Sequence, residues 1–565
     1  MSPSAAGWRR SDRAAVLFLA LLWIALSAFS LPVGDFPIND DWVYGLTVKA
    51  LLATGRFSLP SVTAANVMVQ VYWGALFCLP FGFSFTALRL STLALGLVGV
   101  LSLFALLREA GASRRLALFG ALSLAVNPLY FGLAHSFMSD VPFLALVLVA
   151  MWLFVRGITR DRAGWMIAGF ALAMLDILLR QFALAAVVGF GVAYVFRRGI
   201  TGKTLAVAIL PVMAGTALHF SYVRWLISTG RIPFLGGNTL SDLIPASAAS
   251  FLHRSGENVM AALPGIGLLA LPFLLASLVP LWRGLSPRRR WTGAGALAGV
   301  AVFLLAANHF LHTDLPQRGN VLYPPGLGPL MLRDTLLLNL NLPPTPIWMG
   351  AFWALAIGLG ALAGAAAAAV VCWQAGLVIA ALWHPENRRR VWLPALIISM
   401  AGAYGLALLL VGLRNVLLDR YFLPFGPLVC LLVVAAVGNP RASAAGDRAA
   451  LAVLVVLGLF SVAATHDYLA WNRTRWTATA ALTAAGVDAK RIDGGYEFNG
   501  WTAFDPAYVF TEAKSWWWVV DDEYVIASGP VPGYRVEREY AFSRWLLADR
   551  GRVVTLHRLP VPPGP

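Results

Sequence analysis

Residues 14–31 of this 565-residue chain read AAVLFLALLWIALSAFSL, and Arg9, Arg10 and Arg13 precede them. A run of about 20 apolar residues behind a cationic segment is long enough to cross the hydrocarbon core of a bilayer as a helix. The same pattern occurs in secretory signal peptides, but no convincing small-residue cleavage site follows it. We therefore expect a retained first membrane span with a cytoplasmic N-terminus.

The composition of the rest of the chain also indicates a membrane protein. Of all residues 59% are hydrophobic and 12% are charged, about half the charged fraction of a typical soluble protein. The last 99 residues hold 11 Lys and Arg and 12 Asp and Glu, which leaves 32 and 15 for the first 466. The net charge of +16 thus belongs to the membrane part, which favours a topological role over nucleic-acid binding. We predict a transmembrane domain over 1–466 and an extracytoplasmic soluble domain over 467–565.

Apolar runs of membrane-spanning length recur along the first 466 residues. The thirteen predicted spans are 14–34, 87–107, 114–132, 141–156, 163–179, 182–196, 204–222, 260–282, 291–311, 347–382, 391–413, 421–438 and 448–466. Two regions strain this count, because 163–196 holds two short spans and 347–382 is long for one helix. The apolar stretch 67–85 is predicted to lie on the outer surface as an amphipathic helix, within a first outer loop of residues 35–86.

Cationic clusters fall on one side of this topology. The seven clusters are Arg9/Arg10/Arg13, Arg108/Arg114/Arg115, Arg156/Arg160/Arg162, Arg197/Arg198/Lys203, Arg283/Arg288/Arg289/Arg290, Arg388/Arg389/Arg390 and Arg441/Arg448. They contain 21 of the 32 cations of the membrane part and are accompanied by 5 of its 15 acids. This distribution satisfies the positive-inside rule and sends most carboxylates, and the C-terminal tail, to the outer side.

The C-terminal tail has the pattern of a small mixed α/β domain. Residues 468–485 are predicted to form a helix, and 516–520, 524–527 and 552–559 are predicted strands, separated by Gly and Pro pairs. Its many aromatic residues, Tyr496 among them, suit sugar stacking, core packing or anchoring at the membrane interface. The long outer loop 312–346, which contains Asn320, is predicted to cover the lipid-phosphate end of a donor.

Adjacent carboxylates, Asp40 and Asp41, follow the first span in the predicted outer loop. One interpretation is a general base, with or without a divalent cation, that takes a proton from an acceptor hydroxyl or amine. The other is a solvated loop in which Asp40 or Asp41 caps a following helix, Trp42 to Thr54, that ends at Gly55. Composition alone leaves both interpretations open.

Several segments in order along the chain resemble one family. These are Asn39–Tyr44, Gln70–Phe77, Phe81–Ser84, Leu88–Ser91, Phe137–Phe143 and Asp419–Pro424. Together they resemble the C-type glycosyltransferases, most of all the branch of protein mannosyltransferases and lipid A aminoarabinose transferases. The likeness covers the order of elements over roughly 1–440. Each motif is short, but their order on one predicted side is much more specific than any one of them.

The resemblance implies an integral membrane enzyme of GT-C fold. It would transfer a sugar, with inversion, from a polyprenyl-phosphate carrier to an acceptor outside a bacterial inner membrane. It makes Asp40 the base, with Tyr44 four residues later as in relatives, and it places Asp41, in the position of their usual Glu, with Asp40 among the catalytic residues. Gln70 stands where some relatives carry a phosphate-binding Lys. Tyr44, Gln70 and Tyr421 are the predicted substrate-binding residues.

Asp140, in the second acidic outer loop, is implied as a further catalytic carboxylate. Its position before Pro142 also suits a helix cap. A divalent metal held by Asp40 and Asp140 is an open alternative, and no other cofactor is predicted. His135, close by, is interpreted as a hydrogen-bonding residue outside the catalytic set.

A departing polyprenyl phosphate gathers negative charge that fixed cations can stabilise. Arg180, Arg420 and Lys49 are the candidates. Arg180 follows Asp176 by four residues in apolar surroundings, which fits a structural ion pair as well as a functional cation. Arg420, beside Asp419, is open to a second interpretation as an interfacial anchor.

Two other classes of function compete with transfer. A transporter or flippase also needs many spans and buried charges, but it tends to bind substrate near the midplane between repeated halves, and no inverted repeat is evident. A scaffold for envelope assembly would tolerate the loss of Asp40. Neither a P-loop nor a GxGxxG motif is present, so nucleotide-driven chemistry has no support in the sequence.

Overall fold

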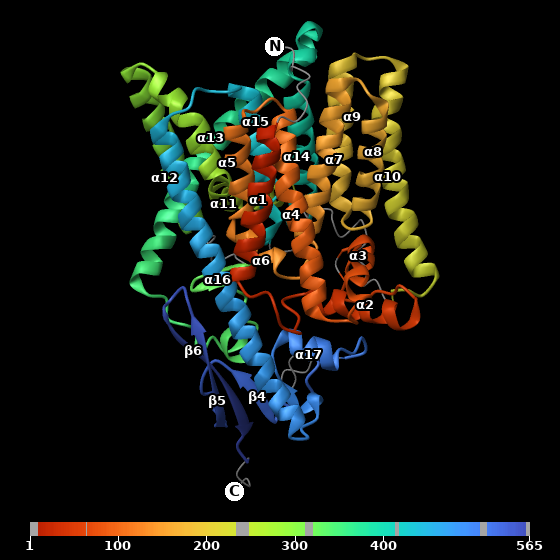
Figure 1. Cartoon of the computed structure of the whole chain (residues 1–565), viewed down its shortest axis with the longest axis vertical. Helices are drawn as coiled ribbons and strands as arrows, with labels where there is room; N and C mark the ends of the chain where they lie inside the picture. The colour runs from red at the N-terminus through yellow and green to blue at the C-terminus, as the bar shows by residue number, and fades with distance from the viewer. Residues whose placement is uncertain are drawn as a thin grey trace.

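The computed structural model describes residues 10–63, 65–232, 248–310, 320–412, 417–508 and 517–560. It is a tall helical bundle with a smaller mixed domain at one end (Figure 1). Its helices are α1 (Arg10–Phe29), α2 (Asp41–Thr54), α3 (Met68–Cys78), α4 (Phe85–Glu109), α5 (Arg114–Ala125), α6 (Pro128–Ala134), α7 (Asp140–Arg160), α8 (Ala163–Ile177), α9 (Leu184–Arg198), α10 (Gly202–Ser228), α11 (Ala248–Gly284), α12 (Pro287–Phe310), α13 (Ile347–Trp383), α14 (Trp392–Gly412), α15 (Phe425–Val437), α16 (Ala444–Ala484) and α17 (Tyr496–Ala503).

Short one-turn segments and strands complete the described chain. The short helices are η1 (Gln181–Ala183), η3 (Arg333–Leu337), η4 (Pro385–Arg390), η5 (Asp419–Phe422) and η6 (Ala489–Arg491). The strands are β1 (Leu322–Tyr323), β2 (Gly326–Leu327), β3 (Ile492–Asp493), β4 (Tyr524–Ala527), β5 (Tyr534–Arg544) and β6 (Asp549–Arg558).

The helical bundle confirms the predicted polytopic class. Eleven helices of the described chain are long and apolar enough to cross a membrane, or twelve if the bent pair α5–α6 is one span. Each of the thirteen predicted spans coincides with a helix. The predicted span outside this count is 163–179, which is α8, an apolar helix of only 15 residues that falls below the length of a full span.

The bend of 59° between α5 and α6 has a local cause. Pro128 cannot donate a backbone hydrogen bond, and the Asn127 side chain accepts bonds from the N–H groups of Leu129 and Tyr130. A new helix therefore begins at this point instead of the old one continuing.

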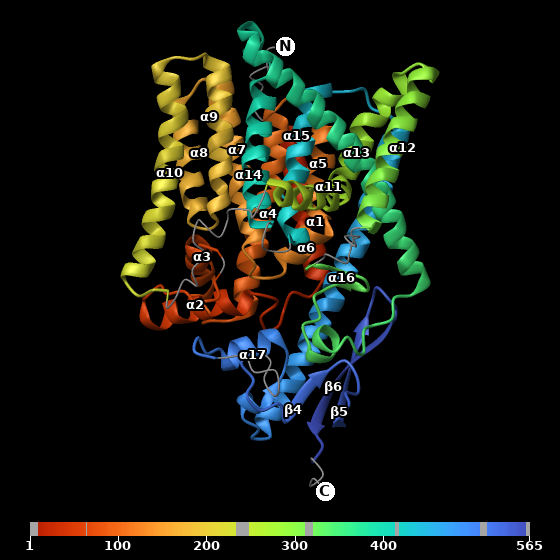
Figure 2. The same ribbon diagram turned by 180° about the vertical axis from the view of Figure 1, so that it is seen from behind.

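Ion pairs gather the predicted cytoplasmic clusters at one end of the bundle, the upper end in Figures 1 and 2. Arg108 pairs with Asp12 at 3.2 Å, Arg156 pairs with Glu109 at 3.1 Å, and Arg115 pairs with Asp447. Asp161 also pairs with Arg198, so four of the five acids predicted on this side bind arginines of the clusters. The bundle has one cationic end, and the C-terminal domain lies at the other.

The first loop forms surface helices at the end that carries the C-terminal domain (Figure 1). As predicted, α2 ends at Gly55, whose left-handed backbone (φ 67°) closes the helix onto Leu51. The predicted surface helix is α3, whose 11 residues are too few to span a bilayer. The backbone N–H groups of Val67 and Met68 donate to Leu179 and Leu178, which fixes the start of α3 against the α8–α9 turn.

The C-terminal domain is the predicted mixed α/β module. Its sheet has the order β3-β4-β6-β5, with β3 parallel to β4 and the other pairs antiparallel. Strand β4 and most of β6 match their predicted ranges, whereas the strand expected over 516–520 is wrong where it is described, because Trp517 and Trp518 have left-handed backbones and form a turn. Residue 516 lies outside the described residues.

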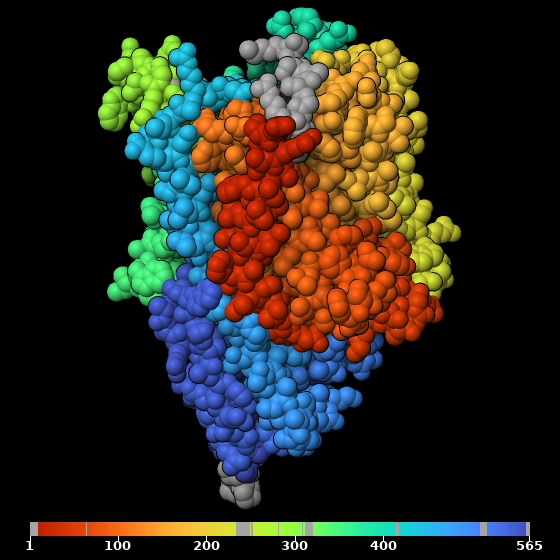
Figure 3. Space-filling view, viewed as in Figure 1, coloured from red at the N-terminus to blue at the C-terminus, as the bar shows by residue number. Residues whose placement is uncertain are grey.

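One helix joins the bundle to this domain. The 41 residues of α16 continue past His466, so the predicted domain boundary falls inside a continuous helix. The described residues after it form a lobe below the bundle (Figure 3). The same helix contacts both the membrane part and the sheet, so the two parts meet along a rigid element.

Candidate active site

Three charged side chains from distant segments meet where the first loop, α7 and η5 converge. Arg420 Nη2 lies 3.4 Å from Asp40 Oδ2, and Arg420 Nε lies 4.0 Å from Asp140 Oδ2. The side chain of Arg420 is 7% exposed and that of Asp140 is 2% exposed, while Asp40 keeps 30% of its surface. The cluster is therefore buried on one side, and Asp40 is its accessible member.

Arg180 is the fourth charged residue of the cluster and binds Asp140. Its Nη1 donates to Asp140 Oδ1 and its Nε donates to Ser139 Oγ, both at 2.9 Å. The predicted alternative, an ion pair with Asp176, is wrong, since both carboxylate oxygens of Asp176 have no hydrogen-bond partner among the described residues. Arg180 turns instead toward the predicted catalytic loop. Asp140 thus sits between two guanidinium groups.

The backbone around Asp40 directs its carboxylate into the cluster and away from a helix cap. Asp40 occupies the N-cap position of α2, but its side chain makes no cap hydrogen bond. Asn39 before it has a left-handed backbone (φ 56°) and donates its N–H to Glu497 Oε1 at 3.1 Å. Glu497 in turn pairs with Arg475 at 2.7 Å, and both side chains are fully buried. A buried ion pair of the C-terminal domain therefore fixes the loop that presents Asp40.

Two residues outside the predicted site contact this cluster. Tyr496 Oη donates to Asp40 Oδ1 at 3.0 Å, and Asn320 Oδ1 accepts from Arg420 Nη1 at 2.7 Å. Asn320 Oδ1 also accepts from the Asn39 side chain at 2.8 Å, so it links the two halves of the site. From the sequence, Asn320 could be assigned only to a long outer loop and Tyr496 only to an aromatic-rich tail. Contacts between residues so far apart in the chain produce no local sequence pattern that would predict them.

Asp419 fixes the backbone that follows Asn320. Its carboxylate accepts the backbone N–H groups of Val321 and Leu322 at 3.0 and 2.8 Å. The neighbouring Arg420 is buried among these polar groups, so the structure favours a site cation over the alternative of an interfacial anchor.

Two of the remaining predicted site residues, Tyr44 and Tyr421, lie next to the charged groups of the cluster. Tyr44 is buried, and the charges of Asp40, Asp140, Arg180 and Arg420 all act on it, while burial raises its pKa above the ordinary value. Tyr421 follows Arg420, whose Cζ lies 5.6 Å from its ring.

Gln70 and Lys49 lie away from the charged groups. The Gln70 amide donates to the carbonyl of Phe137 and so supports the loop before Asp140. Lys49 is exposed with Nζ 5.1 Å from the Trp501 ring. The structure therefore does not bring Lys49 to the cluster, and its role as a phosphate-binding cation stays a prediction without geometric support. His135 is buried and hydrogen-bonded to Ser30 Oγ and the Phe131 carbonyl, outside the cluster.

The donor set of the cluster does not fit the metal alternative. Asp40 and Asp140 are the only carboxylates in it, and both face Arg420. The described residues contain no group of three or more His, Cys, Asp or Glu side chains placed to hold a metal ion. Hard divalent cations take six or more oxygen ligands. We derive no chemical step through a metal.

Asp41 is a buried neighbour with a different environment. It is 1% exposed, and its Oδ2 accepts the N–H of Ile38 at 3.3 Å. Burial raises the pKa of Asp41 to about 7, although backbone hydrogen bonds and the charge of Arg89 act in the opposite direction. The two adjacent carboxylates therefore have separate environments, one facing the cluster and one enclosed behind it.

The raised pKa of Asp41 predicts a pH dependence of stability. Because its folded-state pKa lies near 7 and its unfolded value near 4, the folded protein holds the extra proton between these values. The stabilisation is complete below pH 4 and is lost as pH rises through 7. We expect the thermal midpoint in detergent to fall between pH 5 and 8, and to fall less in Asp41→Asn. Asp35→Asn, in the same loop, should keep the wild-type slope; parallel curves for Asp41→Asn and wild type would contradict the assignment.

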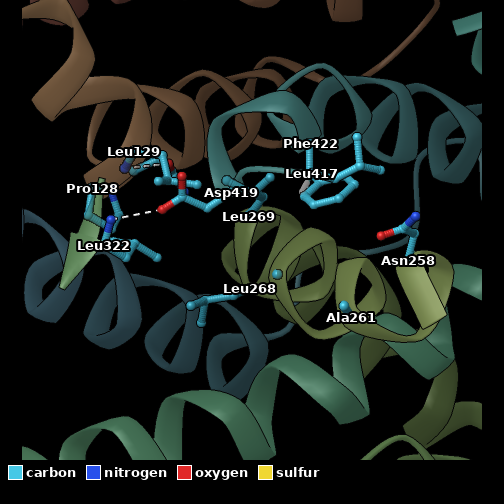
Figure 4. Close-up of a pocket in the computed structure, with 12 residues that line it drawn as sticks. Pro128, Leu129, Asn258, Ala261, Leu268, Leu269, Leu322, Leu417, Asp419 and Phe422 are labelled. Atoms are coloured by element: carbon cyan, nitrogen blue, oxygen red, sulfur yellow. Dashed lines mark hydrogen bonds between the residues drawn. The ribbon is translucent and has the colours of Figure 1, made fainter. Parts of the chain in front are cut away.

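An apolar groove approaches the cluster from the bundle. Beside this groove lies a cavity lined by Leu129, Leu268, Leu322 and Asp419 (Figure 4). Asn258, Leu417 and Phe422 line both this cavity and a groove of about 460 Å³ between α11, α13, α14 and α15. The groove wall is almost wholly aliphatic and aromatic. Phe422 of η5 lines both spaces, so both lie beside the short helix that carries Arg420.

Comparison with known proteins gives one family match. Residues 67–227 match the family model described as dolichyl-phosphate-mannose-protein mannosyltransferase. This segment holds α3 to α10 and includes Gln70, Asp140 and Arg180. The resemblance to C-type glycosyltransferases that the motifs indicate is thereby confirmed for this part of the chain. No curated protein sequence gives a significant match.

Solved structures of three membrane transferases resemble the chain at low identity. The Pmt1-Pmt2 protein O-mannosyltransferase complex of S. cerevisiae with its sugar donor shares 14% identity over 39% of this chain and 34% of that chain, with a TM-score of 0.33. ArnT from Cupriavidus metallidurans bound to undecaprenyl phosphate shares 16% over 96% and 98%, at 0.41. The Archaeoglobus fulgidus oligosaccharyltransferase with Zn and sulfate shares 14% over 80% and 52%, at 0.39. This chain spans about a third of the yeast chain.

Proposed function

We propose that this protein is an inverting membrane glycosyltransferase that moves a sugar from a polyprenyl-phosphate carrier to an acceptor on the extracytoplasmic side. The observation that carries the proposal is the accessible carboxylate of Asp40 beside the buried guanidinium of Arg420, 3.4 Å apart, where an apolar groove reaches η5. A base, a fixed cation and a lipid-sized apolar path are the three parts that this reaction needs.

The proposed reaction is a single displacement. Asp40 accepts the proton of an acceptor hydroxyl or amine, and the oxygen or nitrogen lone pair forms the new bond to the anomeric carbon. The bond between that carbon and the phosphate oxygen breaks in the same step, and the electron pair leaves with the polyprenyl phosphate. One displacement inverts the configuration at the anomeric carbon. Arg420 is placed to stabilise the charge that develops on the leaving phosphate.

Arg180 and Asp140 are proposed to position this cation. Arg180 bonds Asp140 at 2.9 Å, and Asp140 faces Arg420 Nε at 4.0 Å, so the carboxylate separates two positive groups that would otherwise repel each other. The family matched over residues 67–227 takes its name from a lipid-phosphate-linked mannose, which supports a donor of this class. The 460 Å³ groove would hold the first isoprene units of its carrier.

We propose that the protein lies in a bacterial inner membrane, and the cationic end of the bundle supports a cytoplasmic position for that end. The clusters of Arg108, Arg115 and Arg156 lie at this end, and Asp40 and the C-terminal domain lie at the opposite one. The transmembrane domain 1–466 would hold donor and catalytic groups. The domain 467–565 would face the acceptor.

The test compares lipid-linked sugars and envelope glycans in a strain that lacks this protein, complemented with wild type or Asp40→Asn. We expect one polyprenyl-phosphate sugar to accumulate in the deletion strain, one sugar to be missing from a glycan, and only wild type to restore both. Full complementation by Asp40→Asn would exclude Asp40 as the base, and a deletion strain with no accumulated lipid-linked sugar and an unchanged glycan would refute the transferase proposal. Accumulation of a lipid on the cytoplasmic side alone would favour a transporter or flippase.

The hydrogen bond from Tyr496 to Asp40 predicts a smaller effect of the C-terminal domain on the same reaction. Tyr496→Phe removes only the hydroxyl that donates to Asp40 Oδ1 and should lower the transfer rate by about 3- to 10-fold, the cost of one ordinary hydrogen bond. The measurement is initial rate in membranes at saturating donor. Tyr540→Phe, on β5 with its ring near Arg538, is the matched control and should leave the rate unchanged. Equal rates for Tyr496→Phe and wild type would contradict the role.

A further inference from the structure

Two turns at the cationic end of the bundle share a sequence pattern. The segment that joins α11 to α12 reads WRGLSPRRRW over 282–291, and the segment that joins α13 to α14 reads WHPENRRRVW over 383–392. Each begins and ends with Trp and contains one Pro and three consecutive Arg. Both project from the upper end of the molecule, yellow-green and teal in Figure 1. We name these two segments the arginine turns.

One arginine of each turn closes the helix that precedes it. Arg290 donates from Nε to the Leu285 carbonyl at 2.7 Å and from Nη2 to the Arg283 carbonyl at 2.9 Å. Arg388 donates in the same way to two carbonyls near the end of α13, at 3.1 and 2.8 Å. The last carbonyls of a helix lack partners within the helix, so a guanidinium group there satisfies them. These bonds fix the shape of both turns.

The other two consecutive arginines of each turn are exposed. These are residues 288–289 and 389–390, and no carboxylate of the described chain pairs with them. Glu386, the acid of the second turn, lies 3.4 Å from His384 instead, and its side chain is itself 70% exposed. Each turn therefore presents two adjacent guanidinium groups without an internal counter-charge.

Three other arginine clusters at this end bind carboxylates of the protein. The pairs are Arg108–Asp12, Arg115–Asp447, Arg156–Glu109, Arg160–Glu109 and Arg198–Asp161. The arginine turns differ, since together they hold seven arginines and one acid. The positive-inside rule accounts for the side on which these arginines lie, but it does not account for the missing acids or for the Trp at both ends.

The tryptophans are suited to the membrane interface. Trp291 is 80% exposed and Trp383 is 81% exposed, each beside a long apolar helix. The second Trp of each turn packs on the protein: Trp282 lies against α12, and Trp392 lies against a small cluster of α9, α13 and α14 residues. Trp is enriched at the level of lipid headgroups, because its ring is apolar and its N–H is polar. Each turn thus offers one open Trp and two open arginines.

From these observations we propose that each arginine turn binds the headgroup of an anionic phospholipid in the cytoplasmic leaflet. The two open arginines donate to the lipid phosphate, and the open Trp contacts the glycerol region and the first part of the acyl chains. The inference uses the cytoplasmic position proposed for this end of the bundle, but it is independent of sugar transfer. It adds two lipid sites at the end opposite the candidate active site.

The test titrates the full-length protein in neutral detergent with phosphatidylglycerol or phosphatidylcholine and counts bound lipids by native mass spectrometry. We expect wild type to bind one phosphatidylglycerol per turn, more tightly than phosphatidylcholine. Arg288→Gln/Arg289→Gln and Arg389→Gln/Arg390→Gln should each weaken one site by about 10- to 30-fold, the effect of two surface arginines on an anionic lipid. Because all four side chains are exposed, the variants should unfold at the wild-type temperature in detergent alone.

Arg441→Gln/Arg448→Gln is the matched control. It removes two exposed arginines from the same end of the molecule, outside the arginine turns, and should bind phosphatidylglycerol as wild type does. An equal loss in this control would overturn the proposal, because general surface charge would then explain the binding. Equal binding of the two lipids or wild-type binding by both turn variants would also overturn it. Displacement of the lipid by inorganic phosphate at equal concentration would mean a site for free anions and would overturn it too.

Asp40→Asn separates this proposal from the proposed function. The variant should bind phosphatidylglycerol as wild type does while failing in transfer. If Asp40→Asn transfers sugar normally and the lipid sites respond as expected, the proposed base fails and the lipid sites stand. If the lipid sites fail while Asp40→Asn loses transfer, the reverse holds.

Discussion

Asp40→Asn should lower the rate of sugar transfer by about 10²- to 10⁴-fold, the usual contribution of a general base, with little change in folding. The side chain is 30% exposed, and an amide oxygen can still accept the Tyr496 hydroxyl that the carboxylate accepts at 3.0 Å. The variant therefore removes the proton acceptor and keeps the shape of the site. The measurement is single-turnover transfer in membranes, with the lipid-linked sugar that accumulates in the deletion strain as donor.

Asp35→Asn is the matched control for this variant. Asp35 lies in the same loop, and its Oδ1 accepts the N–H of Phe85 at 2.7 Å, a bond that an amide oxygen can also accept. It should transfer at the wild-type rate. A rate for Asp40→Asn within threefold of wild type would exclude Asp40 as the base and leave the arginine cluster without its proposed chemistry.

The second large effect is expected at Arg420. Its guanidinium bonds Asn320 through Nη1 and faces Asp40 through Nη2, while Nε faces Asp140. A lysine keeps one positive charge but cannot direct donors to three groups at once. Arg420→Lys should therefore lower kcat by about 10²- to 10³-fold, the cost of removing one fixed donor from a transition state, with a smaller change in the KM of the donor.

Arg473→Lys tests whether any arginine near the first loop has this effect. The Arg473 guanidinium bonds the carbonyls of Leu31 and Val33 at 2.9 and 3.1 Å but does not contact the cluster, so its kcat should stay near wild type. A kcat for Arg420→Lys equal to that of Arg473→Lys would show that the position of the Arg420 donors is not used in the transition state. A proportional rise in KM with unchanged kcat would reassign Arg420 to ground-state binding.

The motifs predicted most of the charged cluster, but they did not predict its connections. Asp40, Asp140, Arg180 and Arg420 were all identified from short patterns near predicted span ends, where charges are costly unless they have a function or a partner. Arg180 was assigned an alternative partner one helical turn away, and the fold gives it Asp140 instead, because α8 ends at Ile177 and Arg180 lies in the turn beyond it. Lys49 was included for its charge and proximity in sequence, and α2 points it to Trp501.

The sequence alone determined the membrane class, the polarity of charge along the bundle and the mixed character of the C-terminal domain. These properties follow from composition and from the spacing of apolar residues. An apolar run of about 20 residues forms a membrane-spanning helix, and the cations between such runs indicate the cytoplasmic side of the membrane. Only the tertiary structure decided which groups meet. Asn320 and Tyr496 reach Arg420 and Asp40 across 100 and 456 residues, through packing of the long loop against η5 and of α17 against α2. Contacts between residues so far apart in the sequence depend on how whole helices and loops pack, and a local sequence pattern does not predict that packing.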